Sequence, residues 1–161
     1  MVDKSSKQIL LVPVDFSLHS KAALLKACEL AECMKASVVV LHVVHDPAEL
    51  PGYYATMTKK KRLVRIEDVA REMLEDFIDK LLKSNPQYHC LAKSKLRLVT
   101  GLPVTRILEV AERVGASMII MGSQGRTGLK HILLGSKAEQ VVHLSHIPVT
   151  IVKAEKTDKQ R

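Results

Sequence analysis

Apolar and polar residues alternate along this chain in blocks whose spacing changes in a regular way. Short runs of aliphatic and β-branched residues predict buried strands, and longer stretches with apolar residues three or four apart predict helices. We expect a long loop over residues 45–58, where two prolines and a glycine break the pattern. The expected strands are 8–14, 37–44, 95–100, 117–121 and 148–152, and the expected helices are 18–35, 59–83, 104–114 and 137–145.

The regular alternation of strand and helix indicates the fold class. Strands that are apolar on both faces are typical of a parallel sheet covered by helices on each side. Because crossovers between such strands are right-handed, we expect one doubly wound, five-stranded α/β domain with the strand order 3-2-1-4-5. The domain should span residues 8–153, between a disordered N-terminus (1–7) and a flexible polar tail (154–161). Ligands of such sheets bind beyond the carboxyl ends of the strands where the winding reverses, here between strands one and four.

Composition limits the classes of function. The chain has 161 residues, of which 47% are hydrophobic, and this suffices for one domain with a sizeable core. Its net charge of +8 would suit a polyanion such as nucleic acid. The charge is uneven, however, with a basic run at Lys59–Arg62 and a wholly polar tail, and only 3% of residues are aromatic. Nucleic acid is therefore not the expected partner, and a polyanion binder stays an alternative.

The cysteines and the N-terminus bear on the compartment. The three cysteines, Cys28, Cys33 and Cys90, contain no CxxC pair and predict neither a disulfide framework nor a zinc knuckle. The N-terminal stretch "MVDKSSKQ" is polar and has no apolar core of a signal peptide. No apolar run approaches the ~20 residues of a membrane-spanning helix. We expect a cytoplasmic protein without a membrane segment.

Four of the seven glycines fall in the segment "MGSQGRTGLKHILLGS", residues 121–136. They stand at the exit of the fourth strand and the start of the last helix, where backbone N–H groups can approach an anion and a helix N-terminus favours phosphate. Ser136 and Glu139 also match a capping box, which would explain Ser136 without a ligand. Lys137 in the first turn disfavours the helix unless an anion or solvent compensates its charge.

Two better-known phosphate loops do not fit this segment. The order Gly-Ser-Lys is not that of a Walker A loop, and "DFSLHSKA" after the first strand has no glycine for a dinucleotide fingerprint. The spacing Gly122-x2-Gly125-x9-Gly135-Ser136 instead resembles the signature of the universal stress protein family, in its ATP-binding branch. The stretches "VPVDFS", "LHVV" and "HIPVTIV" add to this resemblance, which covers nearly the whole chain.

The resemblance implies a binding site for ATP, with AMP or ADP as alternatives. Asp15 and the Val43 backbone would hydrogen-bond the adenine, although Asp15 could instead cap the following helix, a role that Ser17 can also fill. A Mg²⁺ ion would be held by the phosphates and water, because the chain shows no carboxylate cluster. Lys137 departs from the family pattern and could contact the terminal phosphate. The remaining residues implied in the site are Pro13, Val14, Met121, Gly122, Gln124, Gly125, Arg126, Gly135 and Ser136.

The resemblance also implies partners and a role. Family members typically dimerise through the last strand, here Pro148–Val152, which agrees with the need to cover an apolar sheet edge. No catalytic constellation is evident, so we expect a nucleotide-dependent stress-response regulator of an unidentified downstream protein, with slow ATP hydrolysis at most. The alternative within the same fold is an interaction module that binds no nucleotide and keeps its glycines for the turn alone.

Overall fold

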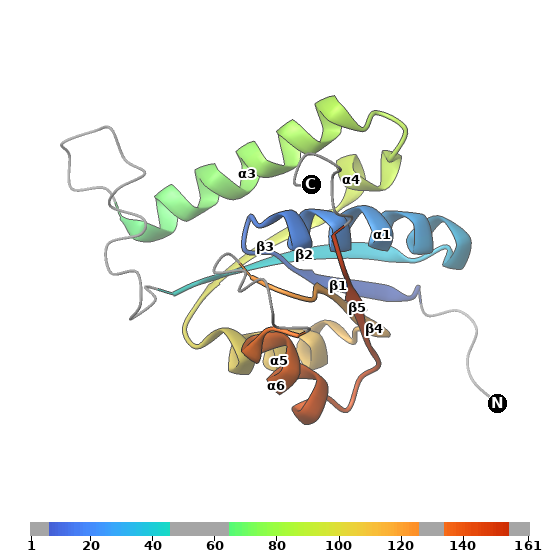
Figure 1. The fold of residues 1–161 in the computed structure, drawn as a ribbon. Helices are drawn as coiled ribbons and strands as arrows, with labels where there is room; N and C mark the ends of the chain where they lie inside the picture. Colours follow the sequence, from blue (N-terminus) through green and yellow to red (C-terminus); the bar gives the residue numbers. More distant parts are fainter. Residues whose placement is uncertain (1–6, 46–64, 126–133, 155–161) are drawn as a thin grey trace, which may run out of the picture.

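A five-stranded parallel sheet in the order β3-β2-β1-β4-β5 forms the middle layer of the computed structural model, which describes residues 7–45, 65–125 and 134–154 (Figure 1). This confirms the expected fold class and strand order. The strands are β1 (Ile9–Pro13), β2 (Ser37–Val44), β3 (Lys95–Thr100), β4 (Met118–Gly122) and β5 (Val149–Val152). The helices are α1 (Leu18–Met34), α3 (Ile66–Ser84), α4 (His89–Lys93), α5 (Pro103–Val114) and α6 (Ser136–Leu144).

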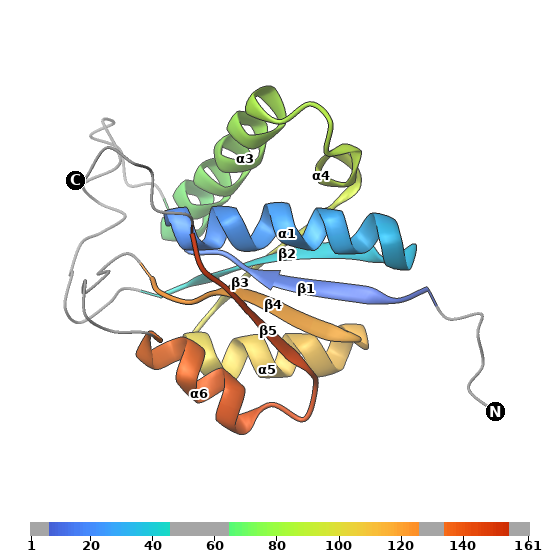
Figure 2. The same cartoon turned by 45° about the vertical axis from the view of Figure 1, so that its right-hand side comes forward.

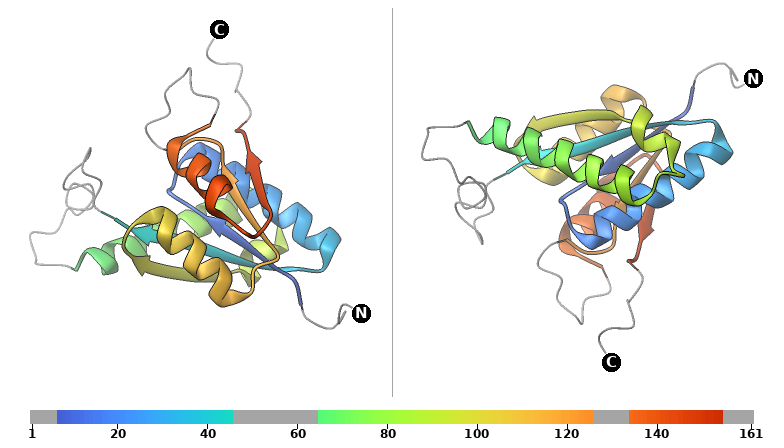
Figure 3. Two further views of the ribbon diagram at one scale, coloured as in Figure 1. Left: turned by 90° about the horizontal axis from the view of Figure 1, so that it is seen from below. Right: turned by 90° about the horizontal axis from the view of Figure 1, so that it is seen from above.

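Helices cover both faces of the sheet, with α1, α3 and α4 on one side and α5 and α6 on the other (Figures 2 and 3). The run of apolar residues in the central strand β1 is continuous because both of its faces are covered. Leu10 and Val12 pack into the core under α1, α3 and α4, whereas Leu11 packs into the core under α5 and α6. All three side chains are fully buried, as expected for a parallel strand with both faces covered.

Local sequence signals fix several helix ends. Ser17 caps α1, because its hydroxyl accepts a hydrogen bond from the Ser20 N–H at 3.1 Å. Helix α5 starts with Pro103 in its first turn and ends at Gly115, whose φ of 65° is the left-handed conformation that favours glycine. These caps leave α1 starting directly at the carboxyl end of β1, where the candidate site lies.

Some expected boundaries differ from those observed. The short helix α4 was not expected, because five residues with one buried apolar side chain, Leu91, show no helical period. Helix α3 is described from Ile66, and the expected start of this helix at residues 59–64 lies outside the described residues. The rest of the loop 46–58, the basic run 59–62, residues 1–6 and residues 155–161 are outside them as well.

The two edges of the sheet differ in character. At β3, Lys95 and Arg97 are exposed, and such charges protect an open strand edge from pairing with another chain. At the other edge, the four residues of β5 are apolar or small and only half-buried. None of the helices in the described ranges is long and apolar enough to cross a membrane.

Candidate functional site

The carboxyl end of β1 is fixed to β2 through both backbone groups of Val14. Its N–H donates to the Leu41 carbonyl at 2.8 Å, and its carbonyl accepts from Nδ1 of His42, also at 2.8 Å. His42 is only 4% exposed, so this bond is shielded from water. Val14 is therefore held at the end of the sheet, and Asp15 follows it directly into the space beyond β1.

The turn between β1 and α1 is built on an unusual backbone conformation. Phe16 has a φ of 65°, which is rare for a bulky side chain and persists only where neighbours hold it in place. Its ring lies 4.4 Å from the ring of His42 and 5.5 Å from that of Phe77, measured between centroids. Asp15 Oδ1 accepts from the Ser17 N–H at 3.1 Å. One carboxylate oxygen of Asp15 thus braces the turn, while Ser17 caps the helix.

Val43 on β2 lies beyond the last residue pair with β1. That pair is Pro13–Leu41, and the Leu41 carbonyl points toward β1, where it accepts from Val14. The Val44 carbonyl accepts from the Gly101 N–H on the opposite edge of the strand. Because backbone groups alternate along a strand, the N–H and carbonyl of Val43 face the β1 side, where β1 has already ended. We call the space beyond the ends of β1 and β4, bounded by Asp15 and Val43, the crevice.

At the end of β4, Gly122 is explained by packing. A Cβ on this residue would lie 2.7 Å from both the carbonyl carbon and the Cβ of His19, in the first turn of α1. Met121 before it is 7% exposed and belongs to the core under α5 and α6. Both residues border the crevice, but the contacts observed for them are with the protein itself, and these contacts account for their residue types without a ribose or a phosphate.

Ser123, which the sequence analysis did not single out, joins four elements. Its N–H donates to the Val152 carbonyl at 2.8 Å, and its own carbonyl accepts from the Gly135 N–H at 2.7 Å. Its hydroxyl lies 3.2 Å from Nδ1 of His19, which also accepts from the Ala154 N–H at 3.3 Å. Since this nitrogen accepts from a backbone N–H, it carries no proton, and the Ser123 hydroxyl is the donor. Ser123 is 2% exposed and ties β4 to β5, α6 and α1.

The exit of β4 and the turn after β1 come together at Gly125. A Cβ on Gly125 would lie 2.9 Å from Oδ2 of Asp15, so this glycine backbone sits against the carboxylate. Gly135 closes the other end of the segment, and a Cβ there would be 3.4 Å from the Ser123 carbonyl oxygen, an ordinary contact. Gly125 therefore lies next to Asp15, and Gly135 lies next to Ser123. Arg126 and Gly128 lie outside the described residues.

The start of α6 corrects one expectation. The capping box of Ser136 and Glu139 is wrong, because Gly135 is the N-cap residue, no side chain caps the helix, and Ser136 is its first residue. The physical reason is the bond from the Gly135 N–H to Ser123, which fixes the position at which the helix begins. That N–H therefore serves the fold. Ser136 and Lys137 are exposed in the first turn, where the backbone N–H groups have no acceptor within the helix.

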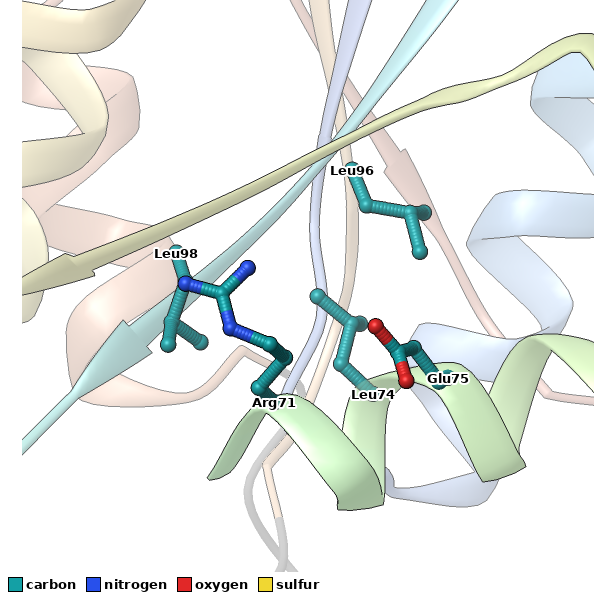
Figure 4. Close-up of a pocket in the computed structure, with 5 residues that line it drawn as sticks. All are labelled: Arg71, Leu74, Glu75, Leu96 and Leu98. Atoms are coloured by element: carbon teal, nitrogen blue, oxygen red, sulfur yellow. The ribbon is translucent and has the colours of Figure 1, made fainter. Parts of the chain in front are cut away.

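Two further observations concern the described part of the chain. No group of three or more His, Cys, Asp or Glu side chains that could hold a metal ion occurs there. A small cavity of about 20 Å³ lies between α3 and the edge strand β3, lined by Arg71, Leu74, Glu75, Leu96 and Leu98 (Figure 4). It has room for roughly one water molecule and none for a nucleotide. This cavity is therefore not a candidate nucleotide site.

The model of the universal stress protein family matches residues 7–153 of this chain. The chain belongs to the universal stress protein family. The universal stress protein MJ0531 of Methanocaldococcus jannaschii is 32% identical over 149 residues, which cover 92% of this chain and 84% of that protein.

Solved structures of universal stress proteins share the fold. One from Archaeoglobus fulgidus, in complex with dAMP, matches with a TM-score of 0.61 and 22% identity, covering 92% of this chain and 98% of its own. Another universal stress protein, in complex with cAMP, matches with a TM-score of 0.59 and 22% identity, covering 94% of this chain and 100% of its own. Both of these relatives bind adenine nucleotides.

Proposed function

We propose that this universal stress protein binds an adenine nucleotide in the crevice, with ATP as the principal ligand and AMP or ADP as alternatives. The observation that supports the proposal is the close approach of Gly125 to Asp15, where an added Cβ would lie 2.9 Å from Asp15 Oδ2. The two residues follow the two strands between which the winding of the sheet reverses. The complexes of two relatives with dAMP and cAMP support the same ligand class.

Adenine fits the polar groups at the β1 end of the crevice. Its exocyclic amine is a donor, and its ring nitrogens are acceptors. Asp15 Oδ2 would accept from the amine, and the Val43 backbone, which faces the gap beyond β1, would complete the hydrogen bonds to the ring. Pro13 and Val14 would form the apolar wall of this pocket. Oδ1 of Asp15 is already bonded to the Ser17 N–H, so the carboxylate is held in place before a ligand arrives.

The phosphates would lie toward the β4 exit and the first turn of α6. There the Gly125 backbone, the Ser136 hydroxyl and the N–H groups of the α6 first turn offer donors to anionic oxygens. Lys137 is exposed in that turn and would add a cation near the terminal phosphate. A Mg²⁺ ion would take its ligands from phosphate oxygens and water, and it would neutralise part of the phosphate charge when bound. Gln124, Arg126, Met121 and Gly122 complete the proposed contact set.

We propose regulation by occupancy, with at most slow hydrolysis. Among the described residues beside the crevice, Nδ1 of His19 accepts from the Ser123 hydroxyl and the Ala154 N–H, and Oδ1 of Asp15 accepts from the Ser17 N–H. Neither of these atoms is available to take a proton from water. The bound nucleotide would then set which surface is offered to a downstream protein. We place the protein in the cytoplasm, where its three cysteines would be kept as thiols.

We further propose a homodimer through residues 148–152. Strand β5 is an edge of the sheet with half-buried apolar side chains, and Val142 and Leu144 on the neighbouring helix α6 are 43% and 58% exposed. Pairing of two β5 edges would satisfy the backbone groups of both. Light scattering after size exclusion should give twice the monomer mass. Ile151→Pro, which removes an N–H that points away from β4, should shift it toward the monomer mass.

The test of nucleotide binding compares two glycine substitutions. Gly125→Ala places a methyl group 2.9 Å from Asp15 Oδ2, whereas Gly135→Ala makes only ordinary contacts. In titration calorimetry with ATP we expect Gly125→Ala to weaken binding at least about tenfold, roughly 1.4 kcal/mol, and Gly135→Ala to weaken it less. Asp15→Asn keeps an oxygen for the Ser17 N–H and should lose a similar factor toward ATP. Wild-type affinity in both Gly125→Ala and Asp15→Asn would refute the proposed site.

A further inference from the structure

Two of the three cysteines meet at the contact between α1 and α4. Cys28 lies on the buried face of α1 and is not exposed at all, whereas Cys90, the second residue of α4, is partly exposed. Cys90 packs against the core that contains Cys28, and the two free thiols interact closely enough that each shifts the pKa of the other. The third cysteine, Cys33, is exposed on α1. It stands five positions after Cys28, so the two do not share a helix face.

The neighbouring residues hold the two thiols in place. Tyr88, two residues before Cys90, donates its hydroxyl hydrogen to Oε1 of Glu29 at 2.9 Å, and Glu29 follows Cys28 directly. Leu91 beside Cys90 is 1% exposed and belongs to the same core as Cys28. The burial of Leu91 in the core and the hydrogen bond between Tyr88 and Glu29 therefore both hold α4 against α1. Figures 1 and 2 show α4 beside the C-terminal half of α1, at the opposite end of the sheet from the crevice.

We propose that Cys28 and Cys90 form an oxidation-sensitive dithiol that hydrogen peroxide converts into an intramolecular disulfide. The first step takes place at Cys90, whose thiolate attacks one oxygen of the peroxide. The O–O bond breaks, the leaving hydroxide takes a proton to become water, and Cys90 becomes a sulfenic acid. The sulfur of Cys28 then displaces the hydroxyl group from Cys90, and the thiol proton of Cys28 leaves with it as a second water. Two thiols have lost two electrons in all, and one peroxide has become two waters.

The environments of the two sulfurs set this order. The hydrogen bond from the Cys28 thiol lowers the pKa of Cys90, and only the thiolate is a strong nucleophile. The same contact and burial in the core raise the pKa of Cys28, which keeps Cys28 protonated until the sulfenic acid stands next to it. Peroxide also reaches the partly exposed Cys90 more easily than the buried Cys28. Cys90 is therefore the attacking thiol and Cys28 the resolving thiol.

The proposal suits a reducing compartment, where disulfides are transient and serve sensing. A small dithiol would reverse the reaction by thiol–disulfide exchange and restore both cysteines. The disulfide would cross-link α1 to α4 and enclose β2 and α3 in the loop between them. It involves none of the residues proposed to bind nucleotide, so it can be tested without reference to nucleotide binding.

The experiment uses the full-length protein, fully reduced and then exposed to hydrogen peroxide. At each time the sample is denatured in an alkylating reagent, and mass spectrometry counts the remaining thiols and maps the peptides. We expect a species that has lost two thiols, with a Cys28–Cys90 cross-linked peptide, to form about tenfold faster than Cys33 is oxidised. Dithiothreitol should return all three thiols.

Cys33→Ser is the matched control, because it removes an exposed cysteine from the same helix and should leave the cross-link and its rate unchanged. Cys90→Ser should abolish rapid loss of the Cys28 thiol. In Cys28→Ala, Cys90 should stop as a sulfenic acid that dimedone traps, and if this variant fails to fold, the wild-type peptide map and Cys90→Ser decide alone. Oxidation that starts at Cys33, or that leaves Cys28 as a thiol while Cys90 is lost, would overturn the proposal.

Discussion

Replacing Gly122 by alanine tests whether this signature glycine is required by the fold or by a ligand. The added Cβ would lie 2.7 Å from the carbonyl carbon and the Cβ of His19 and 2.9 Å from its carbonyl oxygen. The shorter distance is roughly 0.7 Å inside the 3.4 Å at which ordinary contact begins. The obstacle is the backbone of α1, so the strain can be relieved only if the helix moves away from β4.

Such overpacking lowers stability by typically 1–3 kcal/mol, and we expect Gly122→Ala to reduce the free energy of unfolding by about that amount in the absence of nucleotide. For a chain of this length the melting temperature should fall by roughly 2–12 °C. Urea denaturation followed by circular dichroism measures the change, with Gly135→Ala as the matched glycine control. An unchanged urea midpoint in Gly122→Ala, combined with lost ATP binding, would refute the packing explanation and assign this glycine to the ligand.

Three further predictions concern other parts of the chain. His42→Ala should lower the free energy of unfolding by about 2–4 kcal/mol in urea denaturation, because it removes the bond to the Val14 carbonyl and the ring packed on Phe16; a change below about 0.5 kcal/mol would contradict this role. Alkylation of Cys90 should begin at lower pH in the wild type than in Cys28→Ala, because the variant loses the thiol that lowers the pKa of Cys90. The pH dependence of iodoacetamide labelling measures the difference, and equal profiles in the two proteins would contradict the contact between Cys28 and Cys90. Oxidised protein should be more stable than reduced protein by about 2–4 kcal/mol, since the disulfide restrains the unfolded chain, and scanning calorimetry with and without dithiothreitol should show the difference.

The strand order could be predicted from sequence because the signals for it are local. The sequence predicts β1 because Leu10, Leu11 and Val12 form a continuous apolar run, which is buried on both faces of the sheet. It predicts the start of α1 because Ser17 is a residue type that favours the N-cap position. Right-handed crossovers then leave few arrangements of five parallel strands. By contrast, α4 is too short to show a helical period, and its contact with α1 depends on residues that lie 59 apart in the chain, Glu29 and Tyr88.

The candidate site was predictable only in part. Its expected location rests on the strand order and the glycine spacing, and in the structure Gly125 lies close to Asp15. The capping box at Ser136 failed because a tertiary bond from Gly135 to Ser123 decides where α6 begins. The contact between Ser123 and His19 could not be predicted either, because it is also tertiary. The two residues are 104 positions apart, and no local sequence pattern indicates that they meet.

The hydrogen bond between the Gly135 N–H and the Ser123 carbonyl has a consequence for how the chain tolerates change between these two residues. This bond joins Ser123 and Gly135 at 2.7 Å, so the two residues are held together by the protein itself, without a ligand. The entropy of closing a loop between them grows slowly, and a doubling of its length costs only about 0.6 kcal/mol. A change in the length or content of residues 124–134 should therefore leave the five strands in place.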